Sequence, residues 1–127
     1  MSIFDKMMEK NPEILAEKEQ ARMEVKRLTK VFGEPFIVTC TPISQKQLAF
    51  VAETAKTMNE QRVLFIQECC RVEGKKFTDK VFLDWTGCLK GEDVIRKMFR
   101  TGEISKLYEK ISDLSGYGDN AIEELKN

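Results

Sequence analysis

The side chains in this sequence that could do chemistry are mainly carboxylates, and their placement does not suit catalysis. Acidic pairs occur at Glu92-Asp93 and at Glu123-Glu124. Glu92 and Asp93 fall in the first turn of an expected helix, where the helix dipole stabilises negative charge. Glu123-Glu124 falls on an expected polar terminal helix. The chain has no histidine, the commonest general base and a common zinc ligand. The sequence therefore predicts a protein that is not an enzyme.

Motifs for small ligands, metals and nucleic acids are missing as well. Gly74-Lys75-Lys76 lacks the upstream glycine and the following Ser or Thr of a phosphate-binding loop. Lys plus Arg equals Asp plus Glu, at 21 each, whereas nucleic-acid binding needs a basic surplus. None of the four cysteines forms a C-x-x-C pair, so all are predicted to pack as small apolar residues. They are Cys40, Cys69, Cys70 and Cys88. We expect no cofactor and no metal.

The remaining residues describe a helical protein with a regular apolar pattern. Its last third contains two apolar runs at helical spacing, which are predicted to end at Gly102 and Gly116. The first run comprises Val94, Ile95, Met98 and Phe99, and the second comprises Ile104, Leu107, Tyr108, Ile111 and Leu114. No apolar stretch approaches the roughly 20 residues of a membrane helix, and the start of the chain lacks a signal-peptide pattern. We therefore expect a cytosolic protein.

The middle of the chain is predicted to supply the core. Ser44 and Gln47 have the spacing of a capping box and open a helix that breaks near Met58. The apolar run from Val63 to Ile66 predicts the central helix. Thr78 is the expected cap of a short helix that Gly87 ends. Phe82 and Trp85 are predicted to lie in the core together with Met98 and Phe99.

The N-terminal third is expected to contain an arm and a β-hairpin. Asn11-Pro12 predicts a helix start, and the thin apolar stripe that follows favours a lightly docked or mobile arm over residues 1–22. Two β-rich runs around Gly33-Glu34-Pro35 predict an antiparallel hairpin over residues 24–42, with Phe36, Val38 and Cys40 on one face. The fold class is thus mainly α (α+β), with short helices over residues 44–127 and one small hairpin in a single domain of 127 residues.

The glycine-punctuated C-terminal block resembles the phage tail assembly chaperones of the XkdN-like type. The matching elements are Gly91, Lys97-Met98, Gly102-Glu103, Leu107, Ile111 and Gly116-Tyr117. Gly33-Glu34-Pro35 with Phe36 and Ile43-Ser44 resembles the family's strand, turn and second strand. The resemblance extends in the same order over nearly the whole chain, although its turn is short and residues 58–72 match only in apolar character.

The resemblance implies a non-enzymatic assembly factor of the host cytoplasm. Such chaperones bind the aggregation-prone tape measure protein, help to bring tail tube subunits to it and are absent from the mature virion. A small regulatory or adaptor protein that binds a host factor or nucleic acid is the alternative. Phe4, Met7 and Met8 could pack on the chain's own core or bind another protein, including a second copy. The residues predicted to contact partners are Phe4, Met7, Met8, Tyr117, Ile122 and Leu125.

Overall fold

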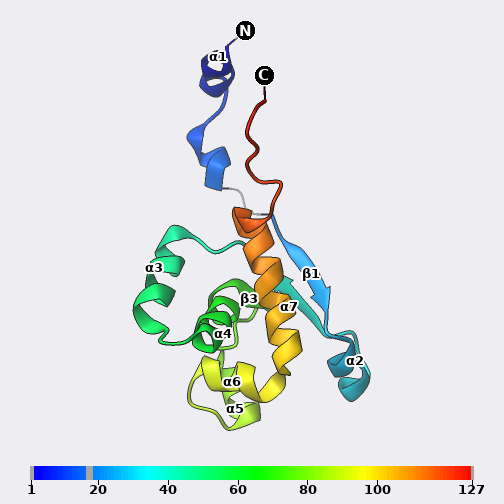
Figure 1. Cartoon of the computed structure of the whole chain (residues 1–127). Coiled ribbons are helices and arrows are strands. Elements are labelled where there is room, and N and C mark those ends of the chain that lie inside the picture. The colour runs from blue at the N-terminus through cyan, green and yellow to red at the C-terminus, as the bar shows by residue number, and fades with distance from the viewer. Residues whose placement is uncertain (1, 17–18, 127) are drawn as a thin grey trace.

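A computed structural model describes residues 2–16 and 19–126 of the chain. These residues form seven α-helices and a three-stranded antiparallel sheet (Figure 1). The helices are α1 (Ile3–Met8), α2 (Lys26–Phe32), α3 (Gln45–Thr54), α4 (Met58–Cys69), α5 (Lys80–Thr86), α6 (Gly91–Met98) and α7 (Thr101–Ser112), with a 3₁₀ turn η1 (Pro12–Ala16) and a π turn η2 (Asp113–Tyr117). The strands are β1 (Ala21–Glu24), β2 (Ile37–Cys40) and β3 (Cys70–Arg71).

Helix α4 is the centre of the core, as the apolar run from Val63 to Ile66 predicted. All four residues of that run are buried, and the helix packs against α3, α6 and α7. The Ser44 hydroxyl accepts a hydrogen bond from the Gln47 amide at 3.1 Å, which confirms the capping box that starts α3. Phe77, from the loop before α5, is fully buried and meets the Phe99 ring at a centroid distance of 5.4 Å. One continuous apolar core therefore joins the helices to the sheet.

The sheet has the order β1-β2-β3, so β2 lies in its centre. Ala21 pairs with Cys40 at one end of the β1–β2 ladder, and Cys70 pairs with Cys40 on the other side. Val38 and Cys40 face the core and are fully buried, as predicted from their alternation. The predicted hairpin over residues 24–42 is wrong in its connection, because helix α2 lies between the two strands, and the sheet also includes a strand far from the N-terminus.

Helix α2 arises from a spacing that the strand prediction overlooked. Val25 and Leu28 are three residues apart, and both are buried. Gly33 adopts a left-handed conformation with a φ of 75°, and its amide donates to the Thr29 carbonyl at 2.9 Å. This is the geometry of a helix C-terminus that glycine favours. The β-branched Val31 and Thr29 suggested a strand. The three-residue spacing of the apolar side chains and the glycine at the C-terminus favour a helix instead.

The C-terminal third differs from its prediction at Gly102 and at its end. Helix α6 ends at Met98, and Gly102 lies inside α7 instead of ending the preceding helix. The expected stop at Gly116 is confirmed, because its φ of 90° breaks the helical path. Residues 118–126 form no regular element, so the polar terminal helix expected around Glu123-Glu124 is absent. The two apolar runs nonetheless pack against the core as predicted.

The N-terminal arm stands away from the body (Figure 1). Its elements α1 and η1 contain no buried residue. The Asn11 side chain accepts a hydrogen bond from the Glu13 amide at 3.0 Å, but the helix it starts is a short 3₁₀ turn that ends at Ala16. The predicted continuation through residues 17–18 lies outside the described residues, and Ala21 already belongs to a strand. Within the described chain, none of the helices combines the length and apolar character that a membrane crossing requires.

Candidate functional site

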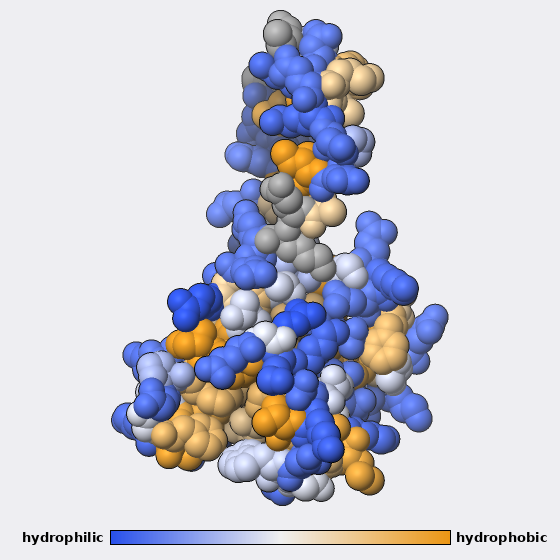
Figure 2. All heavy atoms as spheres, turned by 180° about the vertical axis from the view of Figure 1, so that it is seen from behind, coloured by the Kyte–Doolittle hydropathy of each residue, from blue (hydrophilic) through white to orange (hydrophobic). Residues whose placement is uncertain are grey.

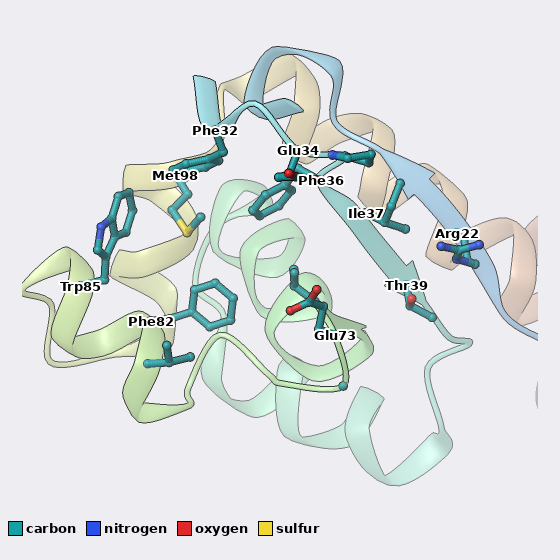
Figure 3. Close-up of a pocket in the computed structure, with 14 residues that line it drawn as sticks. Arg22, Phe32, Glu34, Phe36, Ile37, Thr39, Glu73, Phe82, Trp85 and Met98 are labelled. Atoms are coloured by element: carbon teal, nitrogen blue, oxygen red, sulfur yellow. The ribbon is translucent and has the colours of Figure 1, made fainter. Parts of the chain in front are cut away.

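A groove of about 650 Å³ opens between the outer face of the sheet and helix α5 (Figure 3). Its floor includes Ile37 and Thr39 of β2, the two residues that alternate with the buried Val38 and Cys40. Residues from the α2–β2 connection and from α5 form its walls. The residues that line it are Arg22, Phe32, Glu34, Pro35, Phe36, Ile37, Thr39, Val72, Glu73, Gly74, Val81, Phe82, Trp85 and Met98.

Aromatic side chains give the groove its apolar character. Phe32 and Trp85 meet edge to face at a centroid distance of 5.7 Å, and Phe32 stacks on Phe36 at 5.9 Å. Trp85 is 66% exposed and Phe32 is 44% exposed, although both are large apolar side chains. Contiguous exposed aromatic surface of this kind marks interaction sites in soluble proteins. The prediction that Trp85 lies in the core is wrong.

The sequence contained a signal for this exposed surface. Helix α5 has only seven residues, yet four of them are large and apolar. One face of two helical turns cannot bury all four. Phe82 and Leu83 pack against the core, whereas Val81 and Trp85 lie in solvent. An excess of apolar residues on a short helix therefore indicated that part of it would be exposed.

Hydrogen bonds hold the α2–β2 wall in a fixed position. The Phe36 amide donates to the Thr29 hydroxyl at 2.9 Å, and that hydroxyl donates to the Glu24 carboxylate at 2.8 Å. The Val25 amide donates to the Phe36 carbonyl at 3.0 Å. These hydrogen bonds fix the connection that carries the aromatic rings to the end of β1. A surface that is already fixed loses little conformational entropy when it binds a partner.

The opposite rim of the groove is a tight turn after β3. Val72 and Lys75 exchange backbone hydrogen bonds of 2.9 and 3.0 Å, while Glu73 and Gly74 have φ values of 49° and 80°. Two positive φ values define a type I′ hairpin turn, whose second position glycine favours. The turn holds the Glu73 side chain at the groove (Figure 3).

A partly buried ion pair fixes α2 to the start of α7. The Arg27 guanidinium donates to both carboxylate oxygens of Glu103 at 3.0 and 2.8 Å, and also to the Met98 carbonyl at 2.8 Å. These hydrogen bonds hold the pKa of the Glu103 carboxyl below its usual value and raise the pKa of Arg27. The bidentate geometry stabilises a contact between segments 76 residues apart in the sequence.

Three charged side chains lie around the groove, namely Arg22, Glu34 and Glu73. None of the three forms an ion pair with another residue that the structure describes. The groove therefore offers two carboxylates and one guanidinium beside its apolar side chains. The groove contains no constellation of nucleophile and base, and the described residues contain no group of three or more potential metal ligands among His, Cys, Asp and Glu.

The six residues predicted to contact partners lie away from the groove. All six are exposed, with Phe4, Met7 and Met8 on the arm and Tyr117, Ile122 and Leu125 beyond α7. The arm and the C-terminal tail extend from the same end of the body (Figure 1). Figure 2 shows apolar residues among charged ones on the projecting part. The structure thus places the predicted residues at one end of the molecule and adds a groove that the sequence prediction missed.

The cysteines follow their prediction in part. Cys40, Cys69 and Cys70 are fully buried, and Cys88 is half-buried. The Sγ atoms of Cys40 and Cys70 are 3.5 Å apart across the β2–β3 pair. Hydrogen bonding to Cys40 and burial raise the pKa of the Cys70 thiol well above its usual value. Both thiols are fully buried and therefore inaccessible to reagents in solution, so this pair belongs to the core.

Comparison with known proteins gives one clear result. The family model described as "Phage XkdN-like tail assembly chaperone protein" matches residues 4–127. No curated protein and no solved structure matches the chain. Since the family match extends over the arm, the sheet, the helical core and the tail, the chain belongs to the XkdN-like family of phage tail assembly chaperones.

Proposed function

We propose that this protein is a non-enzymatic chaperone that binds the tape measure protein of its phage and helps to bring tail tube subunits to it. It acts in the cytoplasm of the bacterial host and is absent from the finished virion. The observation that carries this proposal is the family match over residues 4–127. The exposed apolar groups of the structure support it, because a chaperone needs apolar surface that its own fold leaves free.

The C-terminal tail is the proposed contact with the client. Ile122 and Leu125 are 90% and 91% exposed in a segment without regular structure, and Tyr117 precedes them. A segment without regular structure that carries separated apolar side chains can adapt to different stretches of a long client. Each contact is weak, so the strength of binding comes from many copies on one client, and each copy is readily displaced when the tube polymerises.

Co-expression with the tape measure protein from the same genome tests the proposal. We expect the chaperone to raise the soluble fraction of the tape measure protein and to co-purify with it. Unchanged solubility together with no co-purification would contradict the proposal.

A matched pair of variants tests the role of the tail. Leu125→Asp should weaken co-purification several-fold, whereas Leu89→Asp should leave it unchanged. Leu89 is a fair control because it is 93% exposed, as Leu125 is 91% exposed, and it lies between α5 and α6 outside the tail. Equal effects of the two substitutions would show that general surface hydrophobicity, and not the tail, binds the client.

A further inference from the structure

We propose that a pocket between α4, α6 and α7 binds a carboxylate that a protein partner presents on a short apolar stem, as a glutamate side chain does. The pocket has a volume of about 230 Å³. It shares no residue with the aromatic groove or with the C-terminal tail, so the proposal goes beyond the proposed function. The residues that line it are Asn59, Arg62, Val63, Arg96, Phe99, Thr101, Ile104 and Ser105.

Arg62 is the residue of this pocket that points to a ligand. Its Nε atom is buried and has no hydrogen-bond partner. Arg62 also forms no ion pair with another residue that the structure describes. Arg27, by contrast, donates hydrogen bonds to Glu103 and to the Met98 carbonyl. A buried donor without an acceptor destabilises the fold, and an acceptor from outside the chain would remove that cost at Arg62.

Aromatic packing holds Arg62 in place at the pocket. Its guanidinium carbon lies 5.8 Å from the centre of the Tyr108 ring. Tyr108 is itself fixed to α4, because its ring packs on Phe65 at a centroid distance of 4.8 Å and its hydroxyl accepts a hydrogen bond from the Gln61 side chain at 3.1 Å. A guanidinium that is held before binding loses little conformational entropy when it pairs with a carboxylate. Its planar shape allows two parallel hydrogen bonds to that group.

Further hydrogen-bond donors line the same pocket. Thr101 and Ser105 carry hydroxyl groups and Asn59 carries an amide, and none of these three side chains has a hydrogen-bond partner among the described residues. Thr101 is also the first residue of α7, a helix of 12 residues. The positive end of the α7 dipole therefore lies at the pocket and favours negative charge there.

The charge of the pocket favours an anionic ligand. Its lining contains two arginines and no carboxylate. Arg96 lies 3.7 Å from Glu92 and 3.4 Å from Asp93 of its own helix, and these ion pairs are exposed. Exposed pairs contribute little to stability, so Arg96 can exchange them for a ligand at small cost. Arg62 has no such pair to give up.

The apolar residues of the pocket favour a carboxylate over a phosphate. Val63 and Phe99 are buried there, and Ile104 packs beside them against the core. A phosphate has oxygens on every side and would leave some of them unpaired against this surface. The methylene groups of a glutamate side chain would contact it instead. The volume is below the roughly 300 Å³ at which sites for whole cofactors begin, so it suits a single side chain.

Two probes that differ only in charge test the class of ligand. The α-amide of N-acetylglutamate carries the carboxylate, and the α-amide of N-acetylglutamine is its neutral isostere. In nitrogen-correlated NMR spectra at neutral pH, the glutamate probe should move the Nε–H signal of Arg62 and the backbone signals of Thr101 and Ser105. The glutamine probe should bind about tenfold more weakly, because it cannot form charge-assisted hydrogen bonds.

Substitutions of single arginines test the site. Arg62→Met should weaken binding of the glutamate probe about tenfold, and Arg62→Lys should weaken it less, because lysine keeps the charge but not the planar fork. Arg96→Met should weaken it several-fold, and because Arg96 is exposed this variant keeps its fold even if Arg62→Met does not. Arg22→Met is the matched control, since Arg22 is an exposed arginine outside this pocket, and it should bind like the wild type.

Three results would overturn the proposal. The first is equal binding of the two probes or the absence of any shift in the Arg62 signal. The second is binding that survives both Arg62→Met and Arg96→Met, or that falls equally in the Arg22→Met control. The third is inorganic phosphate that moves the same signals at lower concentration than the glutamate probe, which would identify a phosphate site instead. The tape measure protein takes no part in these experiments, so their failure is distinct from failure of the proposed function.

Discussion

The same substitution, glycine to alanine, should have opposite effects on stability at Gly91 and Gly102. Gly91 is the buried first residue of α6. A Cβ atom there would lie 2.8 Å from Thr78 Cγ2 and 2.9 Å from Gln67 Oε1. Gly102 lies in the first turn of α7, and a Cβ atom there would meet nothing within 4 Å. Gly91→Ala should therefore destabilise the protein, and Gly102→Ala should stabilise it.

The expected changes in the free energy of unfolding follow from the close contacts of the new Cβ atom and from the helix propensity of alanine. Thr78 cannot easily move away, because its neighbour Phe77 is fully buried and its own backbone nitrogen would lie 3.3 Å from the new Cβ. Overpacking costs about 1–3 kcal/mol, and alanine recovers up to about 0.5 kcal/mol of helix propensity in a first turn. Gly91→Ala should thus cost about 1–2 kcal/mol. Gly102→Ala, with no clash, should gain about 0.5 kcal/mol.

Thermal and urea unfolding followed by circular dichroism measure both effects. For a chain of this length, about 1 kcal/mol corresponds to roughly 4 °C in Tm. Tm should fall by about 4–8 °C for Gly91→Ala and rise by about 2 °C for Gly102→Ala. A Gly91→Ala protein as stable as the wild type would refute the close approach of α6 to Thr78. A destabilised Gly102→Ala protein would mean that Gly102 adopts a left-handed backbone conformation and ends the preceding helix, as the sequence predicted.

Three further predictions concern the ion pair, the core and the arm. Arg27→Met should cost about 1–2 kcal/mol in urea unfolding, since it leaves Glu103 without its bidentate partner. Because the folded-state pKa of Glu103 is lowered, its contribution is present above the unfolded carboxyl pKa and lost as pH falls through the folded value. The stability difference between wild type and Glu103→Gln should therefore shrink in acid, and a difference that is constant with pH would contradict this. Phe77→Ala should cost about 3–5 kcal/mol by the same urea assay, because the side chain is fully buried, and a loss below about 1 kcal/mol would exclude its central place in the core. Deletion of residues 2–16 should leave one unfolding transition within about 2 °C of the wild-type Tm, because α1 and η1 bury no residue. A large fall in Tm would show that the arm packs on its own body.

Local sequence signals predicted the helical core well. Ser44 and Gln47 formed their capping box, and the run from Val63 to Ile66 became the buried centre, because each signal is contained within one helix. The sheet was harder to predict. Strand β3 has two residues and owes its pairing to Cys40, 30 positions earlier in the chain, so no local pattern reveals it.

The groove could not be predicted from periodicity alone. Trp85 has an apolar side chain on a short helix, which by itself favours burial. Trp85 is exposed because Phe82 and Leu83 occupy the face of α5 that packs against the core, and Phe32 of α2 meets Trp85 at the rim of the groove. Helix α2 is held there in part by the Arg27–Glu103 contact between distant segments, which no local pattern reveals. The family resemblance identified the class of protein correctly, but it contained no information on which surface the fold would leave open.

The rate at which the buried thiols react with an alkylating reagent can report how stably this protein is folded. Cys40, Cys69 and Cys70 have no exposed surface and meet where the sheet joins α4. An alkylating reagent can reach them only when that junction opens, so their labelling rate measures the free energy of opening. Cys88, which is half-buried between α5 and α6, should react earlier and serve as an internal reference. Mass spectrometry of the labelled chain can therefore follow its stability in a crude lysate, with or without assembly partners, and without an added probe.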